Sequence, residues 1–134
     1  PYTGGVLSYN KTGLTIQGVC GADLTIVSSG ANVISFQGNA HSTIDGMTLK
    51  SATGKGLYVN QDTVTIKNSK IHNNDATPST LTNGGGLYNT NAGSFITVDN
   101  VEIYENIANN GAGVVINSGQ DNFSNLIVRN KRAI

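Results

Sequence analysis

The stretch TVDNVEIYENI, residues 97–107, decides the fold because its pattern recurs along the chain. Its core is a hexapeptide that reads apolar, polar, Asn or Gly, any residue, polar, apolar. The clearest copies are IDGMTL (44–49), IKNSKI (66–71) and VDNVEI (98–103), and the weaker copies are IQGVCG (16–21) and FSNLIV (123–128). A recurring unit of this kind is the signature of a repeat architecture.

A second block precedes each hexapeptide and marks the start of the unit. It contains Gly or Ala and ends in Val or Leu, as in GGV (4–6), ANV (31–33), KGL (55–57), GGL (85–87) and AGV (112–114). We therefore expect five units that begin near Val6, Val33, Leu57, Leu87 and Val114, with spacings of 27, 24, 30 and 27 residues. The variation falls in segments rich in Asn, Thr, Ser and Gly, which are typical of loops.

Short apolar–polar alternation within each unit predicts strands, as in VISF (33–36), TVTI (63–66) and FITV (95–98), and no stretch has helical periodicity. A unit of about 25 residues with two or three short strands is one coil of a parallel β-helix. We predict an all-β, right-handed parallel β-helix, a single-stranded β-solenoid of about five coils, with residues 1–134 as one domain. At about 4.8 Å per coil, such a rod is about 24 Å long. The rival fold, an antiparallel sandwich, explains short strands but not the repeated frame.

Composition excludes several classes of function. Lys plus Arg and Asp plus Glu are 8 each, so the basic excess of a nucleic-acid-binding protein is missing and we expect no nucleic-acid partner. No apolar run approaches the roughly 18 to 20 residues of a membrane span. The single Cys20 cannot form an internal disulfide or complete a Cys zinc site, and we expect it to be a small buried residue. We predict no metal and no other cofactor.

Stacked coils turn the frame into columns of equivalent residues along the solenoid. The inward aliphatic column is predicted to contain Ile16, Ile44, Ile66, Val98 and Phe123. Asn68, Asn100 and, less regularly, Asn125 are predicted to form an internal Asn ladder at a bend, because stacked amides hydrogen-bond along a column. Gly18 and Gly46 hold the same place in the earlier coils, where a left-handed backbone conformation suits glycine.

One outward column combines aromatic, cationic and titratable groups: Lys50, His72, Tyr104 and Arg129. Such a strip is a candidate binding site for a sugar or an acidic partner. The alternative is a solvated face that binds nothing. A neighbouring column of Asp45, Lys67 and Asp99 alternates in sign and is predicted to be an ion-pair ladder of structural value.

The stretch NGGGLYNTNAGSFITVDNVEIYENIANNGAGVVI (83–116) resembles the right-handed parallel β-helix repeats of bacterial surface and secreted proteins. It is similar to the repeats of chlamydial polymorphic outer-membrane proteins, whose motifs are GGA-[ILV] and FxxN. GGGL (84–87) and GAGV (111–114) approximate the first motif, and IHNN (71–74) and IYEN (103–106) the second. Residues 13–49 look like the first coils of pectin-lyase-like proteins. The resemblance implies the fold and an extracellular or cell-surface location, but no single function.

The resemblance gives no support for catalysis. Pectate lyases of this fold use clustered Asp for Ca²⁺ and an Arg base, and polygalacturonases carry paired Asp motifs and a Gly-His-Gly. This chain has no Asp-Asp pair and no Gly-His-Gly, so we assign no catalytic residue. Polysaccharide binding or cleavage stays an alternative. Ice binding is a second alternative, because Thr15, Thr43, Thr65 and Thr97 form one file, although only TVT (63–65) has a T-x-T doublet.

The two ends of the repeat array carry no recognisable cap. Open ends of a β-solenoid expose unpaired backbone groups, which are templates for pairing with another chain. We therefore expect an extracellular structural or adhesive solenoid whose partners are copies of itself end to end, or flanking coils of a longer solenoid. A head-to-tail contact of this kind does not close, so it generates a filament.

Overall fold

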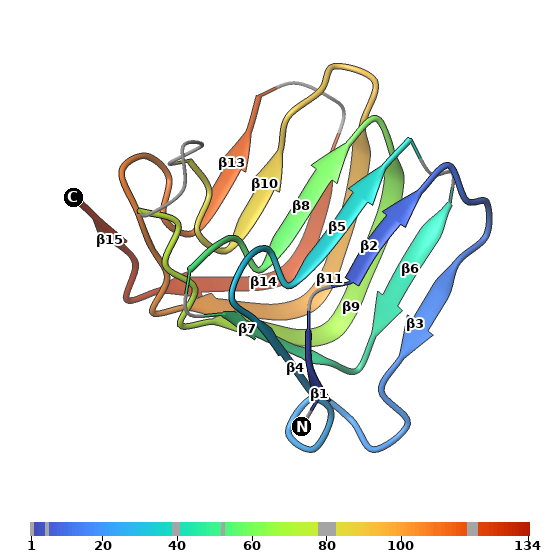
Figure 1. Ribbon diagram of the computed structural model, residues 1–134, viewed down its shortest axis with the longest axis horizontal. Helices are drawn as coiled ribbons and strands as arrows, with labels where there is room; N and C mark the ends of the chain where they lie inside the picture. Colours follow the sequence, from blue (N-terminus) through green and yellow to red (C-terminus); the bar gives the residue numbers. More distant parts are fainter. Residues whose placement is uncertain (1, 5, 39–40, 52, 78–82, 118–120) are drawn as a thin grey trace.

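The computed structural model describes residues 2–4, 6–38, 41–51, 53–77, 83–117 and 121–134 (Figure 1). All regular structure in these ranges is β-strand, and every strand pair is parallel. The strands stack in layers, so the prediction of an all-β parallel solenoid is confirmed.

The larger sheet forms the long, bent side of the solenoid. In the first two layers it consists of separate short strands, β3 (Thr15–Gln17) with β4 (Ile26–Ser29), and β6 (Ser42–Asp45) with β7 (Thr48–Ser51). In the next three layers the two pieces join into β9 (Thr63–His72), β11 (Phe95–Tyr104) and β14 (Asn122–Arg129). The short β1 (Tyr2–Thr3) pairs with β4 at the first edge.

The second sheet contains one strand from each layer: β2 (Val6–Tyr9), β5 (Ile34–Gln37), β8 (Leu57–Asn60), β10 (Leu87–Asn89) and β13 (Val114–Ile116). Its five strands mark five layers, which correspond to about four turns. A small third pair joins β12 (Ile107–Ala108) to β15 (Arg132–Ala133). One predicted start is wrong by a residue, because Val6 lies opposite Ile34 rather than Val33. Val33 and Ile34 are both fully buried apolar residues, so hydrophobicity alone does not show which of them begins the unit.

The inward column of the larger sheet lies in register through all five layers. Ile16 pairs with Ile44, Ile44 with Ile66, Ile66 with Val98, and Val98 with Phe123. The three middle members are fully buried, and each contributes about 1.5–3 kcal/mol through burial. Ile16 at one end is only partly buried, and Phe123 at the other end is exposed. The column therefore runs the length of the core and is incomplete at both ends.

A left-handed residue bends the larger sheet in each of the last four layers. The φ angles are 68° at Gly46, 49° at Asn68, 53° at Asn100 and 48° at Asn125. Asn is among the few residues with a side chain that adopt this conformation readily. Gly18 is different: its φ is not positive, but a Cβ there would overlap the carbonyl oxygen of Gly46. Glycine is thus required at Gly18 for space.

The buried Asn ladder lies at another corner of the coil. Asn74 and Asn106 are fully buried and end the motifs IHNN and IYEN. Asn106 Oδ1 accepts hydrogen bonds from Asn74 N (3.0 Å) and Asn74 Nδ2 (2.9 Å), and Asn106 Nδ2 donates to Ile71 O (3.0 Å).

The predicted ladder of Asn68, Asn100 and Asn125 lies on the outer surface instead of inside the coil. Asn100 Nδ2 donates to Asn68 Oδ1 (2.9 Å), whereas Asn125 Nδ2 donates to Asp99 Oδ1 (3.1 Å). The prediction of an internal ladder at these positions is therefore wrong. The physical reason for the difference is that the left-handed residue lies on the outside of the bend, where its side chain contacts solvent.

Candidate functional site

Three of the four predicted strip residues are brought together by the register of the long strands. His72 lies opposite Tyr104, and Tyr104 lies opposite Arg129. The rings of His72 and Tyr104 are stacked, with centroids 4.6 Å apart and planes 7° apart. The Arg129 Cζ atom lies 4.4 Å from the centroid of Tyr104. The fourth residue, Lys50, pairs with Ser28 of β4, but the pairing of β7 with β9 ends at Leu49, one residue before it.

The stacking determines what the strip can offer to a ligand. His72 comes from the layer on one side of Tyr104 and Arg129 from the layer on the other, so both faces of the Tyr104 ring are covered. A ligand that stacks on an aromatic ring needs a free ring face. The stacking with His72 and the cation–π contact with Arg129 already occupy the faces of Tyr104. His72 Nδ1 lies 2.5 Å from Asn73 Oδ1, so the ring is also held from its own strand end.

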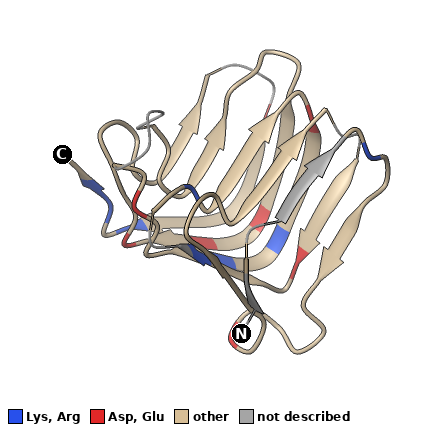
Figure 2. Ribbon diagram, in the orientation of Figure 1, with Lys and Arg blue, Asp and Glu red and all other residues tan. Residues whose placement is uncertain are grey.

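Several charged groups of the larger sheet form ion pairs. Arg129 Nη2 lies 3.4 Å from Glu102 Oε2, and Lys67 Nζ lies 3.4 Å from Asp45 Oδ2. Lys70 pairs with Asp23 from an earlier loop, and the hydrogen bond to this side chain raises the pKa of Lys70. Figure 2 shows both signs of charge over β9, β11 and β14 and no charge on β5, β8, β10 and β13. The sheet therefore has no extended field of one sign for a charged polymer.

The Thr file is present but narrow. Thr15, Thr43, Thr65 and Thr97 lie in register, with Asn122 in the last layer. The outward column beyond the inward aliphatic residues contains Gln17, Asp45, Lys67 and Asp99. Within the described residues this mixed column does not form a second file of Thr beside the first.

A different feature stands out at the last layer. Within the described residues, β14 and β13 each end their sheet, so one side of each strand has no neighbouring strand. Phe123 is 44 % exposed although its column points inward. Leu126, Val128, Val114 and Ile116 are only partly buried. We call these five residues the end face. A hollow of about 370 Å³ adjoins it, lined by Gly111–Val114, Val128, Lys131 and Ala133.

The first layer presents a matching strand. In β3 the order is polar, apolar, polar (Thr15, Ile16, Gln17), as in Asn122, Phe123 and Ser124 of β14. Leu14 and Ile16 are only partly buried. In the nearby loop, Val19, Leu24 and Cys20 are exposed. The expectation that Cys20 is buried is therefore wrong, because its loop projects from the coil.

Sequence reasoning missed two buried charged residues, Lys55 and Asp62. Lys55 Nζ lies 5.5 Å from the centroid of the Tyr88 ring, and burial lowers its pKa. Lys55 belongs to the block KGL, where the later units carry Gly or Ala. This departure from the repeated block is the sequence feature that could have identified Lys55 as unusual. Asp62 has no counterpart in the repeated frame.

Comparison with known protein families, with curated proteins and with solved structures gave no match. The chain is therefore placed by its geometry, as a β-solenoid of about four turns. Within the described residues, no three or more His, Cys, Asp or Glu side chains gather as a metal site would require. The same part of the chain contains no helix long and apolar enough to cross a membrane.

Proposed function

We propose that this chain is an extracellular structural β-solenoid that assembles end to end with copies of itself. The observation that carries the proposal is the inward column, which is buried in the middle layers and open at both ends. At one end Phe123 is 44 % exposed, and at the other end Ile16 is only partly buried. Joining the two ends would complete the column.

Backbone pairing supports the same contact. A parallel strand at the edge of a sheet carries unpaired N–H and C=O groups, and such an edge is a template for another strand. β14 is eight residues long, and the side chains of its inward column are apolar. The repeated frame supplies the register: Asn122, Phe123 and Ser124 of one copy would lie opposite Thr15, Ile16 and Gln17 of the next.

The position of β1 sets a condition on this junction. β1 pairs with β4, so it lies one layer before β3 on the second half of the larger sheet. When β3 of one copy lies on β14 of another, β1 would occupy the space of Leu126–Arg129. Within the described residues, β1 is held by two residue pairs, Tyr2 with Val27 and Thr3 with Ser28, and by a hydrogen bond from Gly4 N to Ser28 O (2.8 Å). We therefore propose that β1 moves aside when copies join.

Negative-stain electron microscopy and sedimentation velocity over a concentration series test the proposal. The wild-type chain is expected to form filaments with a subunit rise of about 24 Å, five layers at about 4.8 Å. Phe123→Lys is expected to abolish assembly, because an inward-pointing charge at an edge blocks strand addition. A chain without residues 1–4 is expected to assemble at lower concentration than the wild type.

Ile127→Lys is the matched control. Ile127 lies in the same strand and is 51 % exposed, but its column points outward, opposite Glu102. This variant is expected to assemble like the wild type. Val128→Lys repeats the test in the other half of the end face, and circular dichroism checks that each variant folds. A wild-type chain that stays monomeric at every concentration, or a folded Phe123→Lys variant that still forms filaments, overturns the proposal.

A further inference from the structure

A buried carboxyl group lies at the corner between β8 and β9. Asp62 is 2 % exposed and directly precedes Thr63, the first residue of β9. Both of its carboxylate oxygens are buried and make no hydrogen bond within the described residues. The hydroxyl oxygen of Ser42, which is 1 % exposed, is buried and unpaired in the same way. These three buried oxygens therefore have no well-formed hydrogen bond within the described residues, although the Thr63 amide and the Ser42 hydroxyl both act on the Asp62 carboxyl group.

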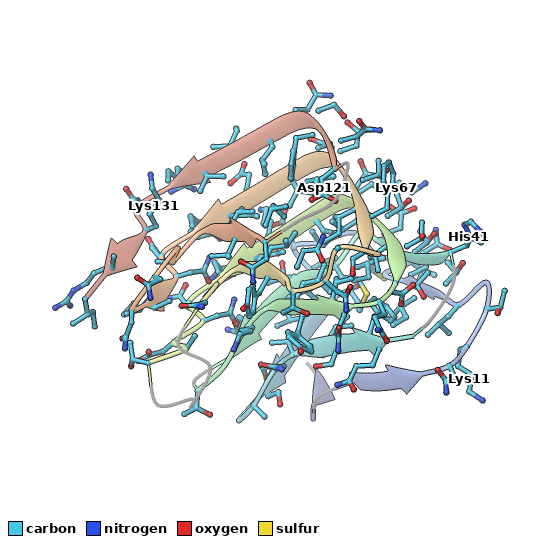
Figure 3. All side chains as sticks on the ribbon, turned by 90° about the horizontal axis from the view of Figure 1, so that it is seen from above. Lys11, His41, Lys67, Asp121 and Lys131 are labelled. Atoms are coloured by element: carbon cyan, nitrogen blue, oxygen red, sulfur yellow. The ribbon has the colours of Figure 1, made fainter. Side chains whose placement is uncertain are left out.

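The backbone around Asp62 belongs to the layered structure. Phe95 N donates to the carbonyl oxygen of Asp62 (3.0 Å), and Gln61 N donates to the hydroxyl of the buried Ser94 (2.9 Å). The charged group that acts on Asp62 from the preceding layer is His41, which is exposed. Figure 3 shows His41 at the side of the molecule opposite Lys131. The corner thus links two adjacent layers, and His41, the charged group that acts on Asp62, lies at the surface.

An ionised carboxylate with so few hydrogen bonds is costly in such a place, because burial penalises the charged form. Burial raises the pKa of Asp62 to about 6; the Thr63 amide, the Ser42 hydroxyl and His41 oppose this rise without cancelling it. A neutral carboxyl group, in contrast, has one O–H donor. It can donate this proton to the hydroxyl oxygen of Ser42, whereas Ser42 acts as the donor towards an ionised carboxylate and the buried negative charge remains.

We propose that Asp62 is an acid-operated lock on this corner of the solenoid. When the carboxyl group is protonated, it donates to Ser42 and the corner stays closed. When it loses the proton, the carboxylate admits water, and the contacts of Asp62 and Gln61 with the next layer weaken. This lock does not depend on end-to-end assembly.

The sign of the pH effect follows from the direction of the shift. The folded-state pKa is raised from 3.8 to about 6, so the stabilisation is fully present below pH 3.8 and is lost as the pH rises through 6. Between these values the folded chain holds one more proton than the unfolded chain. The unfolding equilibrium constant is therefore expected to rise about tenfold per pH unit in this window.

Two measurements test the lock. The first follows the side-chain carboxyl carbon of Asp62 by NMR between pH 3 and 8, with an expected midpoint near 6. The second measures urea unfolding over the same pH range for the wild type, Asp62→Asn and His41→Asn. Asp62→Asn is expected to lose the steep dependence between pH 4 and 6. His41→Asn is expected to keep it, and Asn suits the positive φ of 58° at this position. Hydrogen exchange at Phe95 N and Gln61 N reports whether the corner itself opens.

A titration midpoint near 4, or an Asp62→Asn variant with the pH profile of the wild type, overturns the proposal. Loss of the dependence in His41→Asn would also overturn it, because His41 would then be the sensor. If Asp62→Asn does not fold, the NMR titration and the exchange measurement on the wild type still decide.

Discussion

At the scale of single residues, Asn does two different jobs in this solenoid. At the bend, Asn68, Asn100 and Asn125 provide a left-handed backbone and face solvent. At the buried corner, Asn74 and Asn106 satisfy backbone groups of neighbouring layers. The second job is worth more free energy, because a buried donor or acceptor that loses its partner costs about 1–3 kcal/mol.

We predict that Asn106→Ala lowers the free energy of unfolding by about 3 kcal/mol. The substitution removes the acceptor of Asn74 N and Asn74 Nδ2 and the donor to Ile71 O, all in a buried site. Asn100→Gly is the control: it keeps the left-handed backbone and removes one exposed hydrogen bond to Asn68, so the loss stays below about 1 kcal/mol. Equal losses in urea unfolding would show that the buried ladder has no special role.

At the scale of elements, the small residues before β8, β10 and β13 let the coils pack closely. A Cβ on Gly86 would lie 2.6 Å from Ile103 Cγ2 and 3.0 Å from Asn106 Nδ2, and it would overlap the carbonyl oxygen of Gly113. Gly56 meets Ile71, Asn74 and Gly86 in the same way one layer earlier. The GGL-type block and the buried Asn are therefore one packing unit, repeated in two layers.

We predict that Gly86→Ala destabilises the fold by about 1–3 kcal/mol through overpacking. Neither Gly86 nor Gly93 has a positive φ, so substitutions at these two positions differ in the space available to the added Cβ atom. Gly93→Ala is the control, because a Cβ there meets only Asn91 Oδ1, at 3.9 Å. The control is expected to be neutral or to stabilise by up to about 1 kcal/mol by restricting the unfolded chain. Thermal unfolding compares the two, and a Gly86→Ala variant as stable as Gly93→Ala contradicts the prediction.

The repeated frame predicted the layers because each layer buries the same positions. It placed the inward column from Ile16 to Phe123 and the neighbours His72, Tyr104 and Arg129 in the right order. It did not predict which face of the bend each Asn occupies, because that depends on a backbone angle. It also did not predict that the strip residues cover one another, or that Asp62 is buried, because neither depends on periodicity.

At the scale of the whole molecule, the fold is a one-dimensional stack in which, within the described residues, each strand pairs only with strands of neighbouring layers. Stability in such a stack is a sum of layer and interface terms, so the end layers have half the interfaces of the middle ones. β11 lies between β9 and β14, whereas β14 has a neighbouring strand on one side within the described residues. Local opening should therefore begin at the end face.

We predict that the rates of amide hydrogen exchange differ between these layers. At low concentration, amides of β9 and β11 are expected to exchange through global unfolding, and amides of β14 are expected to exchange at least tenfold faster through local opening. End-to-end assembly adds a neighbour to β14, so its protection should rise with concentration in the wild type and stay constant in Phe123→Lys. Protection of β14 that equals that of β11 at the lowest concentration would mean that the end face is already stable alone. The open column at Phe123 would then give no reason for copies to join.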